Sequence, residues 1–239
     1  MENNFIYLDN ASTTPLSENV LNIINSTYRN YWHNPSSTYE LGIKCSTYLE
    51  KIRSKIAYIF EADPEDIIFT SGSSESTNIV FNNIYENFKN GRVVISNVEH
   101  QATTICANKL RKQNWDIYEW TVNNDGILNI SNIEKFLNND TKLVSIIWGQ
   151  SEIGTIQPVQ FIGSKCEELN IMFHLDGTQI LSNGIFSWKD LKCDFLSLSA
   201  HKFGGPKGIG ILLTKEKSRQ ILKNNDISLT QEFSIRQGT

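Results

Sequence analysis

The chain has 239 residues, of which 39% are hydrophobic and 20% are charged, and its formal net charge is −4. A chain of this size and composition can bury one large core, or one core with a small appendage. The acidic balance offers no basic surface, so nucleic acid is not expected as a main partner. The sequence shows no signal-peptide pattern and no stretch apolar enough to span a membrane. We therefore expect a cytoplasmic protein without a membrane partner.

The cysteines are far apart in the sequence and form no CxxC pair, which gives no support for a zinc site or a redox pair. We expect each of them to be a small buried thiol in a reducing compartment. The four are Cys45, Cys106, Cys166 and Cys193.

Two helices are expected before the first strand. A polar, loop-forming cluster at 9–15 precedes Ser17, which can cap a helix that extends to Tyr28. A longer helix is expected over 41–59, because apolar residues recur there at three- and four-residue spacing.

From residue 67 onward, short apolar runs alternate with helical patterns. We expect strands at 67–70, 92–96, 115–120, 143–148, 171–175, 195–198 and 209–213. We expect helices at about 73–88, 101–113, 130–137 and 161–169. This alternation favours an α/β fold with a mostly parallel sheet of about seven strands and helices on both faces.

Polar residues follow five of these strands, and in parallel sheets ligands gather at the carboxyl ends of the strands. Each segment alone has an ordinary structural interpretation, such as a helix cap or a solvated lysine. Together they place an acid, two histidines and a lysine at one edge of the sheet, which favours a binding site. The segments are Ser71–Glu75, Asn97–His100, Gly149–Thr155, Asp176–Gln179 and Ser199–Lys202.

These residue types meet the chemical requirements of pyridoxal phosphate. That cofactor needs a lysine for a Schiff base, an acid for the pyridine nitrogen, and a helix start with hydroxyls for the phosphate. Lys202, Asp176 and Ser73–Ser74 supply these groups, and His100 is the candidate ring to stack on the pyridine.

Other cofactor motifs fit less well. No GxGxxG follows the first strand, and no HExxH is present. The glycine-rich run Gly204–Gly210 is not a P-loop, because Lys207 is followed by glycine and not by serine or threonine.

Several short motifs, in order along nearly the whole chain, resemble the cysteine desulfurases, which have the class V aminotransferase fold. They are YLDNASTTP at Tyr7–Pro15, NPSS at Asn34–Ser37, IIFTSGSSESTN at Ile67–Asn78, EHQA at Glu99–Ala102, SEIGTIQP at Ser151–Pro158, FHLDGTQ at Phe173–Gln179, SLSAHKFGGPKGIG at Ser197–Gly210 and RQGT at Arg236–Thr239.

The resemblance implies a reaction and a set of roles. L-cysteine would become L-alanine, and the sulfur would pass through an enzyme persulfide to an acceptor protein, as in iron–sulfur cluster assembly. Lys202 would bind pyridoxal phosphate covalently, and Asp176 would pair with the pyridinium nitrogen. His100 would stack on the ring and move protons at the substrate, and Gln179 would hydrogen-bond the O3′ oxygen.

The resemblance also implies how the phosphate is held. Ser74, the Ser73 backbone, Ser199 and His201 would bind it within one subunit. Thr239 would reach the phosphate of the neighbouring subunit in a homodimer.

The chain departs from the family pattern in three places. Ser151 replaces the second of two asparagines, a residue that commonly contacts the cofactor's O3′ and is here a shorter hydrogen-bonding group. Ser228–Glu232 replaces the glycine-rich GGGQE. The chain ends at Thr239, where the family continues into a smaller domain with the persulfide cysteine and a carboxylate-binding arginine.

The resemblance therefore implies a segment 1–15 that packs with the small domain in the family, a pyridoxal-phosphate-binding large domain at 16–239, and no small domain. None of the four cysteines matches the family's catalytic cysteine.

We expect a desulfurase-like protein that is incomplete or impaired alone, for which a separate chain is one candidate source of the small domain. The alternatives are a non-catalytic paralogue that binds cofactor or regulates a partner, another pyridoxal-phosphate lyase or aminotransferase, and a plain interaction domain. The last would require the ordered motifs to be accidental.

Overall fold

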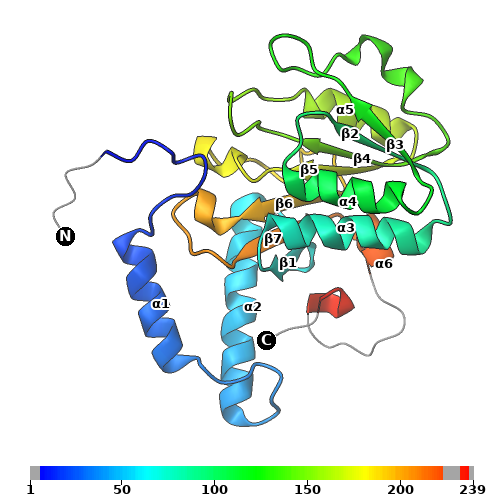
Figure 1. The fold of residues 1–239 in the computed structure, drawn as a ribbon. Helices are drawn as coiled ribbons and strands as arrows, with labels where there is room; N and C mark the ends of the chain where they lie inside the picture. The colour runs from blue at the N-terminus through cyan, green and yellow to red at the C-terminus, as the bar shows by residue number, and fades with distance from the viewer. Residues whose placement is uncertain (1–5, 223–231, 237–239) are drawn as a thin grey trace.

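The computed structural model describes residues 6–222 and 232–236. Within them, a seven-stranded sheet has the order β1-β7-β6-β5-β4-β2-β3 (Figure 1). The strands are β1 (Ile67–Thr70), β2 (Arg92–Ser96), β3 (Asp116–Trp120), β4 (Thr141–Ile147), β5 (Met172–Asp176), β6 (Phe195–Ser199) and β7 (Gly210–Thr214).

Strand β7 alone runs against the others. It pairs antiparallel with β1 on one side and with β6 on the other, whereas all remaining pairs are parallel. The expected α/β fold with a mostly parallel sheet is therefore confirmed. Because β1, β2, β4, β5 and β6 point the same way, the polar residues that follow them meet at one edge of the sheet.

Helices cover both faces of the sheet (Figure 1). On one face of the sheet, strand residues such as Ile68, Val93 and Phe195 pack against α3 and α4. On the other face, the adjacent strand residues Ile67, Val94 and Leu196 pack against α2 and α5. The helices are α1 (Glu18–Asn30), α2 (Glu40–Phe60), α3 (Ser73–Asn87), α4 (Gln101–Arg111), α5 (Val159–Glu168) and α6 (Glu216–Leu222). Short 3-10 turns are η1 (Pro64–Asp66), η2 (Ile130–Lys135), η3 (Ile180–Asn183), η4 (Ala200–Lys202) and η5 (Glu232–Ser234).

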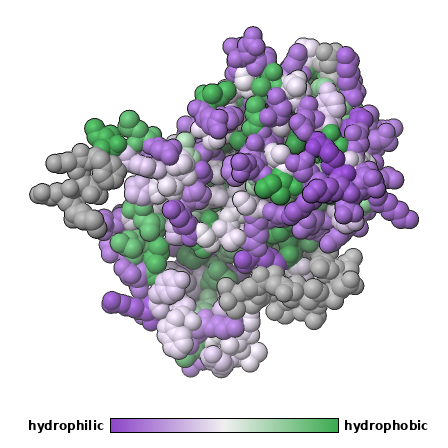
Figure 2. All heavy atoms as spheres, viewed as in Figure 1, coloured by the Kyte–Doolittle hydropathy of each residue, from purple (hydrophilic) through white to green (hydrophobic). Residues whose placement is uncertain are grey.

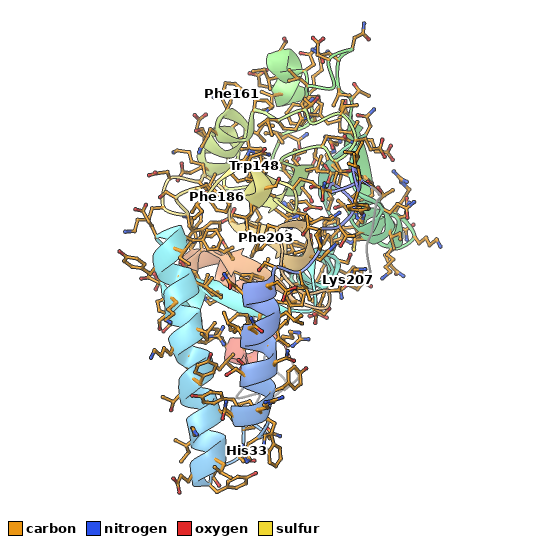
Figure 3. All side chains as sticks on the ribbon, turned by 90° about the vertical axis from the view of Figure 1, so that its left-hand side faces the viewer. His33, Trp148, Phe161, Phe186, Phe203 and Lys207 are labelled. Atoms are coloured by element: carbon orange, nitrogen blue, oxygen red, sulfur yellow. The ribbon has the colours of Figure 1, made fainter. Side chains whose placement is uncertain are left out.

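Helices α1 and α2 form an arm that projects from the sheet, with His33 at its far end (Figures 1 and 3). Helix α1 begins where Ser17 accepts a hydrogen bond from the Val20 backbone N–H at 3.3 Å, and it contains no buried residue. Apolar residues show on its surface in Figure 2, and Ile23 is 61% exposed. Exposed apolar helix surface of this kind is typical of a face that another polypeptide covers.

Several elements differ from expectation, and helix α6 was not among the expected helices. The segment expected as a helix at 130–137 is the shorter 3-10 turn η2. Helix α4 ends at Arg111 rather than at residue 113, because Asn114 adopts a left-handed φ of 64° that stops it. Among the described residues, no helix is both long and apolar enough to cross a membrane.

Candidate active site

Lys202 ends η4, the 3-10 turn that directly follows β6 in the connection to β7. Its Nζ donates hydrogen bonds to the carbonyl oxygens of Ala11 at 2.7 Å and Ser12 at 3.0 Å. Burial lowers the pKa of Lys202, although the charges of Asp176 and Asp9 act in the opposite direction. A lysine with a lowered pKa is neutral more often than a solvated one, and the neutral amine is the nucleophile.

Asp176 ends β5 and is buried. Its Oδ1 accepts hydrogen bonds from Ser73 Oγ at 3.3 Å, from the Thr178 backbone N–H at 3.0 Å, and from the Thr178 hydroxyl. Its Oδ2 receives none from the part of the chain that the structure describes. A buried carboxylate requires donors or a cation, so the second oxygen fits a protonated ring nitrogen.

The start of α3 lies beside Asp176 and is a candidate site for an anion. Gly72 precedes the helix with φ +155°, a conformation that favours glycine, and a Cβ on Gly210 would lie 2.4 Å from Gly72 Cα. The Ser73 backbone N–H donates to Ser199 Oγ at 2.8 Å, so the Ser199 hydroxyl keeps its own proton to donate. Ser74 is exposed, and its hydroxyl has no partner among the described residues. A phosphate placed here would meet the positive end of a 15-residue helix.

His201 lies beside Lys202 and joins the same site to the N-terminal segment. Its Nδ1 is 3.1 Å from Thr13 Oγ1, and its carbonyl oxygen accepts from the Thr14 backbone N–H at 2.8 Å. Burial lowers the pKa of His201, and the positive charges of Lys202 and Lys207 lower it further. The ring is therefore mostly neutral at pH 7, with hydrogen-bonding capacity for a phosphate oxygen.

The other predicted site residues lie at the same edge of the sheet but make fewer contacts. His100 is exposed at the start of α4, where its Nδ1 accepts from the Ala102 N–H at 3.2 Å. Gln179 donates from Nε2 to the Ala11 carbonyl oxygen at 2.7 Å. Ser151 is half-buried in the turn after β4, and within residues 6–222 and 232–236 its hydroxyl has no hydrogen bond.

The predicted residues thus form two directly connected groups. Ser73 links Asp176 to Ser199, and the Ala11 carbonyl oxygen links Lys202 to Gln179. Thr239 lies outside the described residues, as does most of the altered glycine-rich segment at 228–231, and the roles assigned to all of these residues stay predictions.

Sequence reasoning gave no role to three features of the site. Thr178 fixes Asp176, and the Asp-Gly-Thr sequence is a recognisable signal for such an Asx-type turn. The segment Ala11–Thr14 contacts Lys202 and His201, which no local pattern indicates. Glu99 places a carboxyl group between β2 and β4.

The Glu99 carboxyl is enclosed. Its Oε1 accepts from the Ile147 backbone N–H at 2.7 Å and from the Ser96 hydroxyl, and its buried Oε2 has no partner among the described residues. Burial raises the pKa of Glu99 to about 8, and the charge of Asp176 adds to this effect. Because Ile147 pairs with Asp176 across β4 and β5, the two acids share one region of the sheet.

All four cysteines are buried, as expected. Burial raises the pKa of the Cys106, Cys166 and Cys193 thiols, which keeps them protonated. Reactive cysteines need an exposed and electropositive setting, and none of these thiols has one.

The fold and the site together define an α/β domain that presents a lysine with a lowered pKa, a buried acid and a helix start at one sheet edge. The family model described as aminotransferase class-V matches residues 6–229, and the chain belongs to this family. Members of the family depend on pyridoxal phosphate.

Similar proteins within the family are cysteine desulfurases. The mitochondrial cysteine desulfurase of Candida maltosa is 35% identical over 98% of this chain and 49% of its own length. Cysteine desulfurase IscS of Pseudoalteromonas translucida is 33% identical over 98% of this chain and 59% of its own length. The chain therefore spans about half the length of the curated relatives it matches.

Solved structures show the same likeness. A NifS-like protein matches with a TM-score of 0.92 and 32% identity over 98% of this chain and 65% of the other. A structure of SspA in complex with cysteine matches with a TM-score of 0.91 and 29% identity, over 98% of this chain and 68% of that one.

Proposed function

We propose that this chain is the cofactor-binding part of a pyridoxal-phosphate-dependent cysteine desulfurase. Such an enzyme converts L-cysteine to L-alanine and passes the sulfur to an acceptor protein. The observation that carries the proposal is Asp176 Oδ2, which has no hydrogen-bond partner among the described residues and lies at the same sheet edge as Lys202 and the start of α3. The similarity to cysteine desulfurases selects this reaction among those that the family supports.

The described residues fit the cofactor group by group. Lys202 would hold it covalently, Asp176 Oδ2 would accept a hydrogen bond from the ring nitrogen, and Gln179 would contact O3′. The phosphate would bind at the N-terminus of α3 with Ser74, Ser199 and His201. When bound, pyridoxal phosphate supplies an electron sink for the substrate's carbanion.

The protein's own groups would then move protons and control charge. Thr178 and Ser73 donate hydrogen bonds to Asp176 Oδ1 and would hold the carboxyl group so that Oδ2 faces the ring nitrogen. His100 would stack on the ring, and its Nε2, the nitrogen that does not accept from Ala102, would carry a proton at the substrate. Lys202, released by the substrate, would supply a second amine base with a lowered pKa.

The sulfur needs a thiol that the described cysteines do not provide. We propose that the accepting cysteine and the arginine for the substrate carboxylate come from a small domain, in the same polypeptide or in a separate chain. The exposed apolar face of α1 is a candidate surface for that domain. We also propose a homodimer in which Thr239 contributes to the partner subunit's phosphate site.

The test is the absorption spectrum of the purified chain with pyridoxal phosphate, before and after L-cysteine, together with an assay for L-alanine. We expect a visible band in the wild type that Lys202→Ala removes and that Lys207→Ala, a change in an exposed lysine of the same loop, retains. An unchanged band in Lys202→Ala would overturn the assignment.

A second function is favoured by the buried thiols: a cofactor-binding chain with no sulfur transfer of its own. It predicts the same band and its bleaching by cysteine, but no L-alanine even when a reducing thiol is added as sulfur acceptor.

A further inference from the structure

The segment Glu232–Arg236 contacts β1, although the two are far apart in sequence: Phe69 and Glu232 are separated by 163 residues. Glu232 accepts hydrogen bonds from Arg53 Nη2 at 2.7 Å and from the Phe69 backbone N–H at 2.7 Å. Arg53 is 2% exposed and also donates to the Ile67 carbonyl oxygen at 2.5 Å. This buried ion pair fixes the segment beside the strand that leads into the start of α3.

Four residues later, Arg236 contacts the helix start itself. Arg236 Nε lies 2.6 Å from Glu75 Oε1, and Glu75 Oε2 accepts from the Ser71 backbone N–H at 2.6 Å. Burial opposes ionisation of Glu75, but the hydrogen bonds from Arg236 and Ser71 hold the pKa of Glu75 below its usual value. Glu75 is therefore a carboxylate that bridges the guanidinium and the loop before α3.

This carboxylate has a consequence for anion binding. Glu75 lies in the first turn of α3, at the helix end whose partial positive charge attracts anions. An unneutralised carboxylate there would repel a phosphate and compete with it for that positive end. Arg236 removes this conflict, since its charge cancels that of Glu75.

We propose that Arg236 is a positioning residue for the cofactor's phosphate, acting through Glu75. It neutralises the Glu75 charge and, through Glu75, fixes the Ser71 backbone ahead of Gly72 and Ser73. The proposal rests on the proposed binding of pyridoxal phosphate and adds a residue that does not itself contact the phosphate.

The test compares the dissociation constants of pyridoxal phosphate and pyridoxal, measured by visible absorbance and equilibrium dialysis. For Arg236→Ala we expect about tenfold weaker binding of pyridoxal phosphate, or about 1.4 kcal/mol, and unchanged binding of pyridoxal, which has no phosphate. The double variant Glu75→Gln/Arg236→Ala should recover binding to within about threefold, because the amide oxygen still accepts from Ser71 and carries no charge.

Two further variants separate charge from folding. Glu75→Gln alone should bind pyridoxal phosphate at least as tightly as the wild type. Arg111→Ala removes an arginine from the exposed ion pair with Glu119 and should leave the dissociation constants of both ligands unchanged. Equal weakening of both ligands in Arg236→Ala, unchanged pyridoxal phosphate binding, or no recovery in the double variant would overturn this role. Failure of the wild type to bind pyridoxal phosphate would instead overturn the proposed function.

Discussion

Lys202 Nζ donates to the carbonyl oxygen of Ala11 at 2.7 Å, across 191 residues of sequence. Gln179 donates to the same oxygen, so the N-terminal segment contacts two of the side chains proposed to meet the cofactor. The next residues bind the adjacent turn, because Thr14 Oγ1 donates to the His201 carbonyl oxygen and accepts from the Gly204 N–H. The segment therefore forms one wall of the site.

The lowered pKa of Lys202 makes cofactor capture depend on pH. The neutral amine attacks, and an unperturbed lysine has a pKa of about 10.4. We expect the rate constant for binding pyridoxal phosphate to rise with pH and to level off with a midpoint clearly below that value. Stopped-flow absorbance between about pH 6.5 and 10.5 measures it, with Lys207→Ala as a control that keeps the profile. A midpoint at or above the free-lysine value would contradict the prediction.

Thr178 is expected to control affinity through Asp176. Thr178→Val removes the hydroxyl donor to Asp176 Oδ1 but keeps the backbone N–H bond and the side-chain shape. A hydrogen bond to a charged group contributes about 1.5 kcal/mol or more, so we expect about tenfold weaker binding of pyridoxal phosphate. Thr178→Ser retains the hydroxyl and should bind like the wild type. Equal affinities of the Val and Ser variants for pyridoxal phosphate, measured by dialysis, would show that the Thr178 hydroxyl does not control cofactor binding.

Much of the fold could be predicted because its strands are buried. Strands β1 and β2 are buried along most of their length, and each shows a continuous apolar run, Ile67–Phe69 and Val93–Ile95, bounded by polar residues. The arm of α1 and α2 could be predicted as two helices but not as a projection, because its direction depends on tertiary contacts. The 3-10 form of η2 could not be predicted, because its sequence pattern does not distinguish a 3-10 turn from a short α-helix.

The site could be predicted where sheet geometry determines it. Asp176 and Ser199 end neighbouring parallel strands. Because the carboxyl ends of parallel strands meet at one edge of a sheet, the two residues are expected to lie close together. The contacts of Ala11 with Lys202 and Gln179 could not be found, because residues so distant in sequence meet only through the complete fold. The buried state of Glu99 was missed because nothing local shows that β4 covers it.

His174 is expected to make stability depend on pH. It is buried, with Nδ1 2.8 Å from Ser145 Oγ and Nε2 2.8 Å from Ser197 Oγ, and burial lowers its pKa to about 4 although the Asp176 charge opposes this. The unfolded chain binds a proton near pH 6.5 and the folded chain does not, so stability is complete above about pH 6.5 and falls as the pH drops towards 4.

The measurement compares the wild type with His174→Asn, which cannot titrate. Between pH 7.5 and pH 5, the stability advantage of the wild type should shrink by about 2 kcal/mol, determined from urea unfolding. A constant difference between wild type and His174→Asn across this range would show that the ring is not held neutral.

Glu99 should make the folding stability depend on pH in the opposite direction. Its folded pKa of about 8 lies above the value of about 4.3 expected in the unfolded chain, so the folded protein holds a proton that the unfolded one releases. Stability from this residue is complete below about pH 4 and is lost as the pH rises through 8. Glu99→Gln keeps an oxygen to accept from Ile147 and Ser96 and cannot ionise. Its stability relative to the wild type should therefore increase by about 3 kcal/mol between pH 5.5 and 8.5.

The matched control is Glu167→Gln. The hydrogen bond and charge of Lys192 lower the pKa of Glu167, so this residue stays ionised over this range and its difference from the wild type should stay nearly flat. The free energies of unfolding are measured in urea at pH 5.5 and 8.5. Parallel pH profiles for Glu99→Gln and the wild type would mean that Glu99 is ionised in the folded protein.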